Sequence, residues 1–162
     1  MIILIGVAVL LFLITWMLTE HEPILSVYLS EDVQMPVYKT TGSACADIYA
    51  YLKEEIIIPP KDIVKIPTGL YLNIPKGYEV ILRSRSGLSL DGISLANGVG
   101  TIDSDYTKEI MVILQNTSKE EYVITNKMRI AQMTMKKSNR ITFEKRNKLK
   151  STGRGGFGST GK

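Results

Sequence analysis

The chain of 162 residues is nearly without the two side chains on which much enzyme chemistry depends, histidine and cysteine. His21 is the only histidine, which excludes a serine–histidine triad and a histidine-ligated metal. Cys45 is the only cysteine, which excludes an intrachain disulfide and a cysteine-based zinc site, and fits a reducing compartment. Any hydrolytic chemistry must therefore use carboxylates, a metal held by oxygen ligands, or both.

Positive charge is scarce in the first 135 residues and abundant after them. From Lys136 onward there are nine Lys or Arg residues and one acidic residue, Glu144, which gives a net charge of +8. Residues 1–135 have eleven Lys or Arg residues and fifteen Asp or Glu residues, which gives a net charge of −4. This asymmetry indicates either an anionic partner, nucleic acid or polyphosphate, or a solvated tail. We expect no specific nucleic-acid partner, because Phe143 is the only aromatic side chain of the basic connector, residues 136–150.

The first 18 residues carry no charge and are dominated by Ile, Leu and Val. As a helix they would be roughly 27 Å long, enough to cross a hydrocarbon core. No Lys or Arg precedes them and no small-residue cleavage site follows, which argues against a secretory signal. Two interpretations stay open. Residues 1–18 are a membrane anchor with the remaining chain facing the cytoplasm, or the start is over-extended and Met17 is the true first residue.

Residues 23–135 consist of short β-rich runs separated by turn residues, a spacing that predicts an all-β sandwich or barrel. After the N-terminal run, no ten-residue segment has strong helical periodicity. The predicted strands are Ile24–Leu29, Asp47–Tyr51, Glu55–Ile58, Ile63–Ile66, Gly69–Ile74, Tyr78–Arg83, Ile93–Ala96, Val99–Ile102, Glu109–Gln115, Glu121–Ile124, Arg129–Met135 and, within the connector, Ile141–Phe143.

One stretch, N-G-V-G-T-I-D-S-D-Y at residues 97–106, has the composition of a small-molecule site. Its glycines allow a ligand to approach the backbone closely. Asp103 and Asp105 are two residues apart, so in an extended chain both carboxylates project from one face and Ser104 from the other. Tyr106 then offers an aromatic surface. The alternative interpretation is an ordinary acidic hairpin turn.

Four further patches accompany this stretch. They read G-S-A-C-A-D-I-Y-A (42–50), R-S-R-S-G-L (83–88), R-I-A-Q-M (129–133) and S-T-G-R-G-G-F-G-S-T-G (151–161). In order and content the five patches resemble the trimeric dUTP pyrophosphatases (dUTPases), and the resemblance covers roughly residues 24–161. The resemblance implies a jelly-roll-like β-barrel subunit, a glycine-rich lid at residues 151–162 and a homotrimer with shared active sites. It also implies hydrolysis of dUTP to dUMP and pyrophosphate with Mg²⁺, which keeps uracil out of DNA and supplies dUMP for thymidylate synthesis.

The resemblance also assigns roles to individual residues. Asp103 matches the general base that activates water against the α-phosphorus, and Asp47 matches the acid that holds Mg²⁺ through its waters. Asn97 and the following backbone, including Gly100, match the uracil slot, and Tyr106 matches the ring under the deoxyribose. The remaining substrate contacts are Arg85, Ser86, Gly87 and Gln132 in the β domain and Arg154, Phe157, Gly158, Ser159 and Thr160 in the lid.

Several positions depart from the family pattern. Thr152 occupies the usual arginine position of the last motif, and Arg154 would have to reach the γ-phosphate instead. The other departures are Cys45 for glycine, Ser84 for proline, Lys108 for glycine, and Lys127 with Met128 for Gly-Asp or Gly-Glu, which alter a turn more than the chemistry. Three charged residues near the motifs have other expected roles: Arg129 and Asp105 as structural ion-pairing residues, and Arg83 as a phosphate contact or a solvent-facing cation.

Two other functions compete with dUTP hydrolysis. A dCTP deaminase would share the fold, but the intact stretch at residues 97–106 and the G-F-G-S-T-G end favour the pyrophosphatase. A membrane-tethered nucleotide-binding module without turnover belongs to a different class, and it is suggested by the hydrophobic N-terminus and the displaced arginine. Measuring which nucleotide is turned over separates all three.

Overall fold

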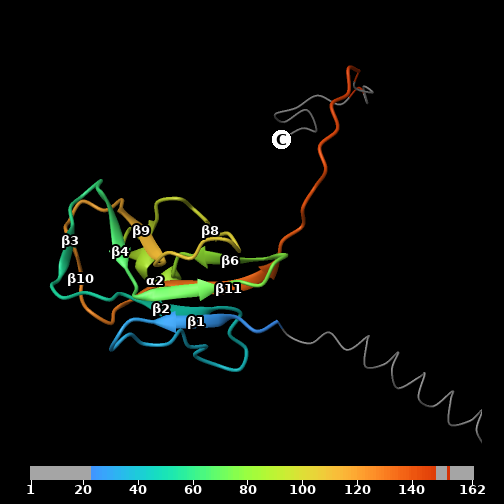
Figure 1. Cartoon of the computed structure of the whole chain (residues 1–162). Coiled ribbons are helices and arrows are strands. Elements are labelled where there is room, and N and C mark those ends of the chain that lie inside the picture. Colours follow the sequence, from blue (N-terminus) through green and yellow to red (C-terminus); the bar gives the residue numbers. More distant parts are fainter. Residues whose placement is uncertain (1–22, 149–152, 154–162) are drawn as a thin grey trace, which may run out of the picture.

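The structure is a computed structural model that describes residues 23–148 and residue 153 (Figure 1). Within these residues the chain forms eleven β-strands and one five-residue helix. The elements are β1 (Ser26–Leu29), β2 (Ala46–Tyr49), β3 (Ile56–Ile58), β4 (Ile63–Pro67), β5 (Leu70–Asn73), β6 (Tyr78–Arg83), α2 (Ser86–Leu90), β7 (Ile93–Leu95), β8 (Gly100–Ile102), β9 (Met111–Asn116), β10 (Tyr122–Ile124) and β11 (Arg129–Lys137).

The strands pair antiparallel in four sheets. The largest has the order β2-β11-β6-β8, the second has the order β4-β9-β7, and β1-β5 and β10-β3 form two-stranded sheets. The predicted all-β class is confirmed. In the part of the chain that the structure describes, each sheet runs between two edge strands, so the closed barrel that was expected is not found.

A single apolar core joins the four sheets, and the alternation of burial along each strand explains why these segments are strands. In β9, Val112 and Leu114 are buried while their neighbours are only partly covered. The core cluster also takes Leu70 from β5, Leu82 from β6 and Ile124 from β10. Because every sheet contributes to the same cluster, the sheets depend on one another for burial.

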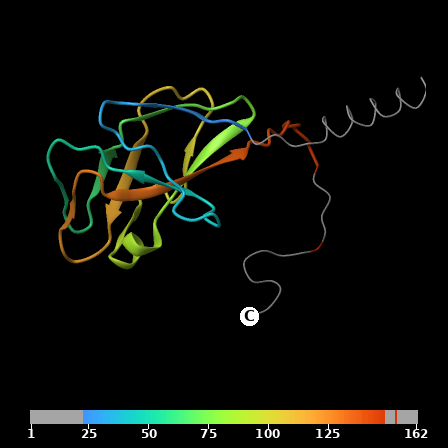
Figure 2. The same cartoon turned by 90° about the horizontal axis from the view of Figure 1, so that it is seen from below.

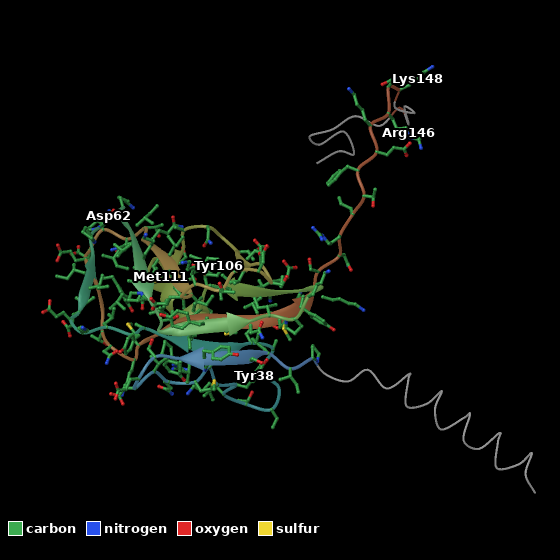
Figure 3. The ribbon with its side chains drawn as sticks, in the orientation of Figure 1. Tyr38, Asp62, Tyr106, Met111, Arg146 and Lys148 are labelled. Atoms are coloured by element: carbon green, nitrogen blue, oxygen red, sulfur yellow. The ribbon has the colours of Figure 1, made fainter. Side chains whose placement is uncertain are left out.

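Eleven of the twelve predicted strands are present, and Ile141–Phe143 is wrong. Ile141 and Phe143 are 70% and 86% exposed and no ladder reaches them. Their alternation is typical of a strand, but the segment leaves the body after β11, as Figures 1 and 2 show. In Figure 3, Arg146 and Lys148 lie well away from Tyr38 and Tyr106 on the domain. The short helix α2 was not predicted, because five residues are too few for a periodic pattern.

The predicted anchor at residues 1–18 lies outside the described residues, as does most of the predicted lid. Across residues 23–148 no helix combines the length and the apolar character that a membrane crossing requires.

The strand before the motif at residues 97–106, β7, and the strand inside the motif, β8, belong to different sheets. β7 pairs with β9, whereas β8 pairs with β6. The four residues between them therefore carry the chain from one sheet to the other. The strands on either side of the whole motif, β7 and β9, pair antiparallel with each other. The sequence could not show this, because the partner strands β6 and β9 lie outside the motif.

The buried amide of Asn116, at the end of β9, connects three segments. Its Nδ2 donates to the carbonyls of Ile58 (2.9 Å) and Glu120 (2.7 Å). Its Oδ1 accepts from the backbone N–H of Ser118 (2.9 Å) and from the Ser118 hydroxyl (2.7 Å). The side chain is almost fully buried, so water cannot replace these bonds.

We expect Asn116→Ala to lower the free energy of unfolding by about 3 kcal/mol, because it leaves two carbonyls and one N–H without their partner. Gln115→Ala is the matched control, since Gln115 is only partly buried and donates one hydrogen bond, to Ser94 (3.1 Å). Its cost should be about 1 kcal/mol. Urea unfolding at one protein concentration measures both, and equal losses would contradict the role assigned to Asn116.

Candidate active site

Most of the predicted phosphate-binding residues meet in one pocket. It has a volume of about 350 Å³ and lies where β2, β6 and β11 adjoin the start of α2. Four cationic side chains and one carboxylate line it: Lys39, Arg83, Arg85, Arg129 and Asp47. The predicted contacts Ser86, Gly87 and Gln132 line it as well. A pocket with this excess of positive charge suits a phosphate chain. Arg83, whose role was left open, belongs to it.

The carboxylate of Asp47 is held between two guanidinium groups. Arg85 Nε donates to Oδ1 at 3.3 Å, and Arg129 NH1 donates to Oδ2 at 3.0 Å. The side chain of Asp47 is 10% exposed, against 22% for Arg85 and 43% for Arg129. Arg85 NH1 also donates to the Arg129 carbonyl at 3.0 Å. The ion-pairing role predicted for Arg129 is therefore present, and Asp47 is its partner.

Ser84 fixes the backbone between the two arginines of R-S-R-S-G-L. Its hydroxyl accepts a hydrogen bond from the Leu95 N–H of β7 (2.9 Å). Its carbonyl accepts from Gln132 Nε2 of β11 (3.2 Å). A proline, which the family commonly has here, offers no hydroxyl. The serine at position 84 is visible in the sequence as a departure from the family pattern, but its contacts are not, because they come from β7 and β11, other strands of the fold.

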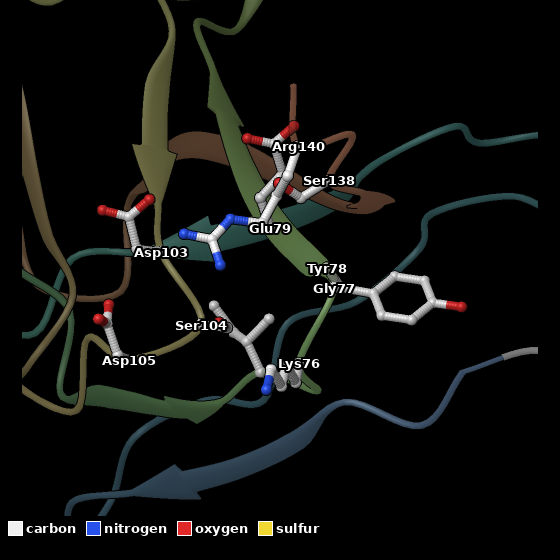
Figure 4. A pocket seen from close by; sticks show the side chains of 10 residues that line it. Lys76, Gly77, Tyr78, Glu79, Asp103, Ser104, Asp105, Ser138 and Arg140 are labelled. Atoms are coloured by element: carbon white, nitrogen blue, oxygen red, sulfur yellow. The ribbon is translucent and has the colours of Figure 1, made fainter. Parts of the chain in front are cut away.

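Asp103 lies in a second pocket, of about 740 Å³, whose wall comes from the β5–β6 turn, the residues after β8 and the residues after β11 (Figure 4). Its charged lining residues are Glu79, Asp103, Asp105, Lys76 and Arg140, which makes the pocket acidic overall. Asp103 and Asp105 both line it, as predicted. Asp105 makes no ion pair with any residue that the structure describes, so the structural pairing expected for it is not found.

The residues after β8 form a turn, not the extended chain assumed from the sequence. The Tyr106 N–H donates to the Asp103 carbonyl at 3.1 Å. Because of this turn Ser104 lines the same pocket as the two aspartates, and the opposite orientation predicted for it is wrong. The Tyr106 hydroxyl donates to the Glu109 carbonyl at 3.0 Å, which holds the ring at the surface beside the pocket.

The predicted uracil slot begins at a tight turn. Gly98 has a φ of 67°, which glycine adopts without strain, and its N–H donates to the Leu95 carbonyl at 3.1 Å. A Cβ at Gly100 would lie 3.0 Å from the Leu82 Cβ and 3.4 Å from Asn97 Nδ2. Gly100 therefore lets β8 pack against β6 with the Asn97 amide alongside.

Tyr122 of β10 lies within the electrostatic reach of Arg85. Burial raises the pKa of Tyr122 above its ordinary value, the Asp91 carboxylate raises it further, and the Arg85 guanidinium lowers it. The phenol therefore stays protonated at neutral pH and serves as a hydrogen-bond donor, not as a base.

Of the site residues predicted in the β domain, Asp103 lines one pocket and the phosphate and metal contacts line the other, whereas Asn97, Gly100 and Tyr106 line neither of these two pockets. Asp103 does not share a pocket with Asp47, Arg85 or Gln132. The lid residues Arg154, Phe157, Gly158, Ser159 and Thr160 lie outside the described residues, as does Thr152. Among the residues with described positions there is no cluster of three or more His, Cys, Asp or Glu side chains that could hold a metal ion.

Comparison with known proteins decides the family. The dUTPase family model matches residues 31–161. The chain belongs to the dUTPase family. It is 48% identical over 130 residues to a deoxyuridine 5'-triphosphate nucleotidohydrolase of Finegoldia magna, covering 78% of this chain and 91% of that protein. It is 45% identical over 135 residues to the protein of the same description from Fusobacterium nucleatum, with coverages of 82% and 92%.

Solved structures of the family share the fold. A variant of the Staphylococcus bacteriophage 80alpha dUTPase, solved with dUpNHpp, has a TM-score of 0.74 at 23% identity and covers 86% of this chain and 99% of its own. The Streptococcus mutans dUTPase has a TM-score of 0.66 at 25% identity, with coverages of 73% and 99%. A variant of the Staphylococcus aureus phage phi11 dUTPase, in which a structural Mg(II) ion is coordinated, has a TM-score of 0.70 at 22% identity and covers 80% of this chain and 100% of its own.

We expect Asp47→Ala to lower the free energy of unfolding by about 2–4 kcal/mol, because it leaves the partly buried Arg85 and Arg129 without their shared partner. The control is Glu144→Ala, which removes an exposed ion pair to Arg146 (2.7 Å) and should cost less than about 1 kcal/mol. Thermal or urea unfolding of both variants measures the difference. A loss for Asp47→Ala no larger than that of the control would show that the paired arginines do not depend on this carboxylate.

Proposed function

We propose that the protein hydrolyses dUTP to dUMP and pyrophosphate, with Asp103 as the general base. The observation that carries this proposal is the pair of pockets in a chain of the dUTPase family: one cationic and suited to phosphates, the other holding an exposed aspartate. Hydrolysis of a nucleoside triphosphate needs cations to bind the phosphates and a base to activate water. The relatives' name, deoxyuridine 5'-triphosphate nucleotidohydrolase, supports the choice of substrate.

The chemistry assigned to Asp103 needs only a carboxylate and a water. Asp103 is exposed in its pocket and pairs with no cation in the residues that the structure describes. It is free to accept a proton from water as the water oxygen bonds to the α-phosphorus and the bond to the β-phosphate breaks. Pyrophosphate then leaves toward the cationic pocket.

Recognition of the nucleoside is assigned to the loop before β8. The backbone of Asn97–Gly100 would pair with the uracil edge and leave no room for a thymine methyl. Tyr106, held by its hydrogen bond to Glu109, would pack under the deoxyribose and exclude a 2′-hydroxyl. Both assignments rest on the family pattern, and the exposed position of Asn97 and Tyr106 is compatible with them.

The residues present fit Mg²⁺ that arrives with the nucleotide, not a metal caged by protein alone. Asp47 is the only carboxylate of the cationic pocket, and both of its oxygens already accept from arginines. Mg²⁺ keeps several waters and takes other oxygens from a triphosphate, so one carboxylate contacting it through water is sufficient. When bound, the ion would neutralise phosphate charge and align the chain for in-line attack.

We further propose that the active sites are shared within a homotrimer. Asp103 and the residues Asp47, Arg85 and Gln132 line different pockets of one chain, which supports this proposal. In a trimer, the Asp103 pocket of one subunit could face the cationic pocket of a neighbouring subunit and form one complete site. The segment after β11 supports it as well, because it leaves the body with Ile141 and Phe143 exposed. Such a segment would place the lid on a neighbouring subunit.

The proposed reaction is tested by pyrophosphate release from dUTP, dCTP, dTTP and UTP with Mg²⁺. We expect release from dUTP alone and a fall of at least about 10³-fold in kcat for Asp103→Asn, which removes the base but keeps the shape. Ammonia release from dCTP would show that the protein is a dCTP deaminase. Tight binding of dUTP without turnover would show that the protein is a nucleotide-binding module and not an enzyme.

The shared site is tested by mixing two inactive variants, Asp103→Asn and Arg85→Ala, under conditions that let subunits exchange. If each site combines Asp103 of one chain with Arg85 of another, random trimers recover about a quarter of the wild-type sites. If both residues serve the same chain's site, every mixed site keeps a defect. Recovery of no activity from a mixture shown to contain mixed trimers would contradict sharing.

A further inference from the structure

Arg140 is a cation beside the predicted base to which no family motif assigns a role. It lies three residues beyond β11, in the basic connector, and lines the pocket that contains Asp103 and Asp105. Figure 4 shows its guanidinium directed from the connector toward the two carboxylates. We propose that Arg140 is a further catalytic residue, which binds the α-phosphate beside Asp103 and neutralises the charge that develops there. This inference rests on the proposed hydrolysis of dUTP.

The connector is fixed to the body where Arg140 begins to project. β11 remains paired with β6 as far as Lys137, which lies opposite Tyr78. The next residue, Ser138, donates its N–H to the Gly77 carbonyl at 2.7 Å. Arg140 is therefore only two residues from a backbone contact on the pocket wall, unlike Arg146, which Figure 3 shows far out along the connector.

The guanidinium of Arg140 is available to a ligand. It forms no ion pair and no side-chain hydrogen bond with any residue between 23 and 148, although Arg146 in the same connector pairs with Glu144. An arginine presents several N–H donors in a planar fork that matches two phosphate oxygens. The space between Arg140 and Asp103 is part of the open pocket, where a phosphate and a water could lie side by side.

Charge explains why such a cation is needed. Glu79, Asp103 and Asp105 give the pocket three carboxylates against Lys76 and Arg140. An anionic phosphate brought close to Asp103 is repelled by them, because like charges at short range near a protein surface are screened less than in bulk water. Lys76 lies toward the other end of the pocket in Figure 4, so Arg140 is the cation placed to offset this repulsion at Asp103.

Steady-state kinetics of dUTP hydrolysis with Mg²⁺ test the inference on the full-length protein. We expect Arg140→Gln to lower kcat about 10- to 100-fold while KM changes less than about 3-fold, because the lost interaction is strongest as charge develops in the transition state. Arg140→Lys should recover part of the rate, and added guanidinium ion should partly rescue Arg140→Ala. The control Arg146→Gln, in the same connector, should leave both constants unchanged.

An unchanged kcat in Arg140→Gln would overturn the inference. A rise in KM alone would also overturn it, because it would show that Arg140 only attracts the substrate electrostatically. Equal loss in Arg146→Gln would overturn it too, because the effect would then belong to the basic connector as a whole. Failure of the wild-type protein to hydrolyse dUTP is a separate result that refutes the proposed function itself. A thermal unfolding midpoint equal to wild type confirms that the variants are folded.

Discussion

The carboxylate of Asp47, held by Arg85 and Arg129, is the interaction on which the geometry of the cationic pocket depends. It joins β2 to the start of β11 and to the junction of β6 with α2, three segments that are far apart in sequence. Burying one acid between two arginines costs desolvation, but two charge-assisted hydrogen bonds compensate for it. Because one carboxylate is shared by two cations, the cluster keeps a positive charge. The pairing therefore both orders the arginines and leaves them able to attract phosphate.

The distribution of charge over the two pockets fits the orientation of dUTP that we propose. The pocket around Asp47 is cationic, and the pocket around Asp103 is acidic. A nucleoside triphosphate carries most of its charge at the β- and γ-phosphates, which suits the first pocket, while its sugar and base carry none and can occupy the second. In the function that we propose, the α-phosphate would lie between these two parts of the substrate, close to Asp103. Because one chain keeps these pockets apart, the boundary between the pockets is a contact between subunits in the trimer that we propose.

Residue patterns predicted the strands well but gave no pairing of strands, for a physical reason. Alternating burial is local, so β9 and β11 could be located from their own residues. Whether a neighbouring strand exists is not local, so Ile141–Phe143 was predicted as a strand although no strand of the described residues pairs with it. The resemblance identified residues of both pockets. Ser84 was visible only as a departure from a motif and Arg140 lies in no motif, and the fold brings them to Gln132 and to the pocket of Asp103.

The turn before β11 shows how a departure from the family pattern can be tolerated beside the site. Lys127 has a φ of 62°, a conformation that costs a non-glycine residue roughly 1–2 kcal/mol. Hydrogen bonds hold the turn in place: Lys127 N–H donates to the Ala50 carbonyl (2.9 Å), and Leu52 N–H donates to Asn126 Oδ1 (3.0 Å). These bonds fasten the end of β2 to the beginning of β11. Since Asp47 and Arg129 lie on those two strands, the turn that carries the strain also maintains their ion pair, and a glycine at position 127 would relax the backbone without changing the residues that contact phosphate.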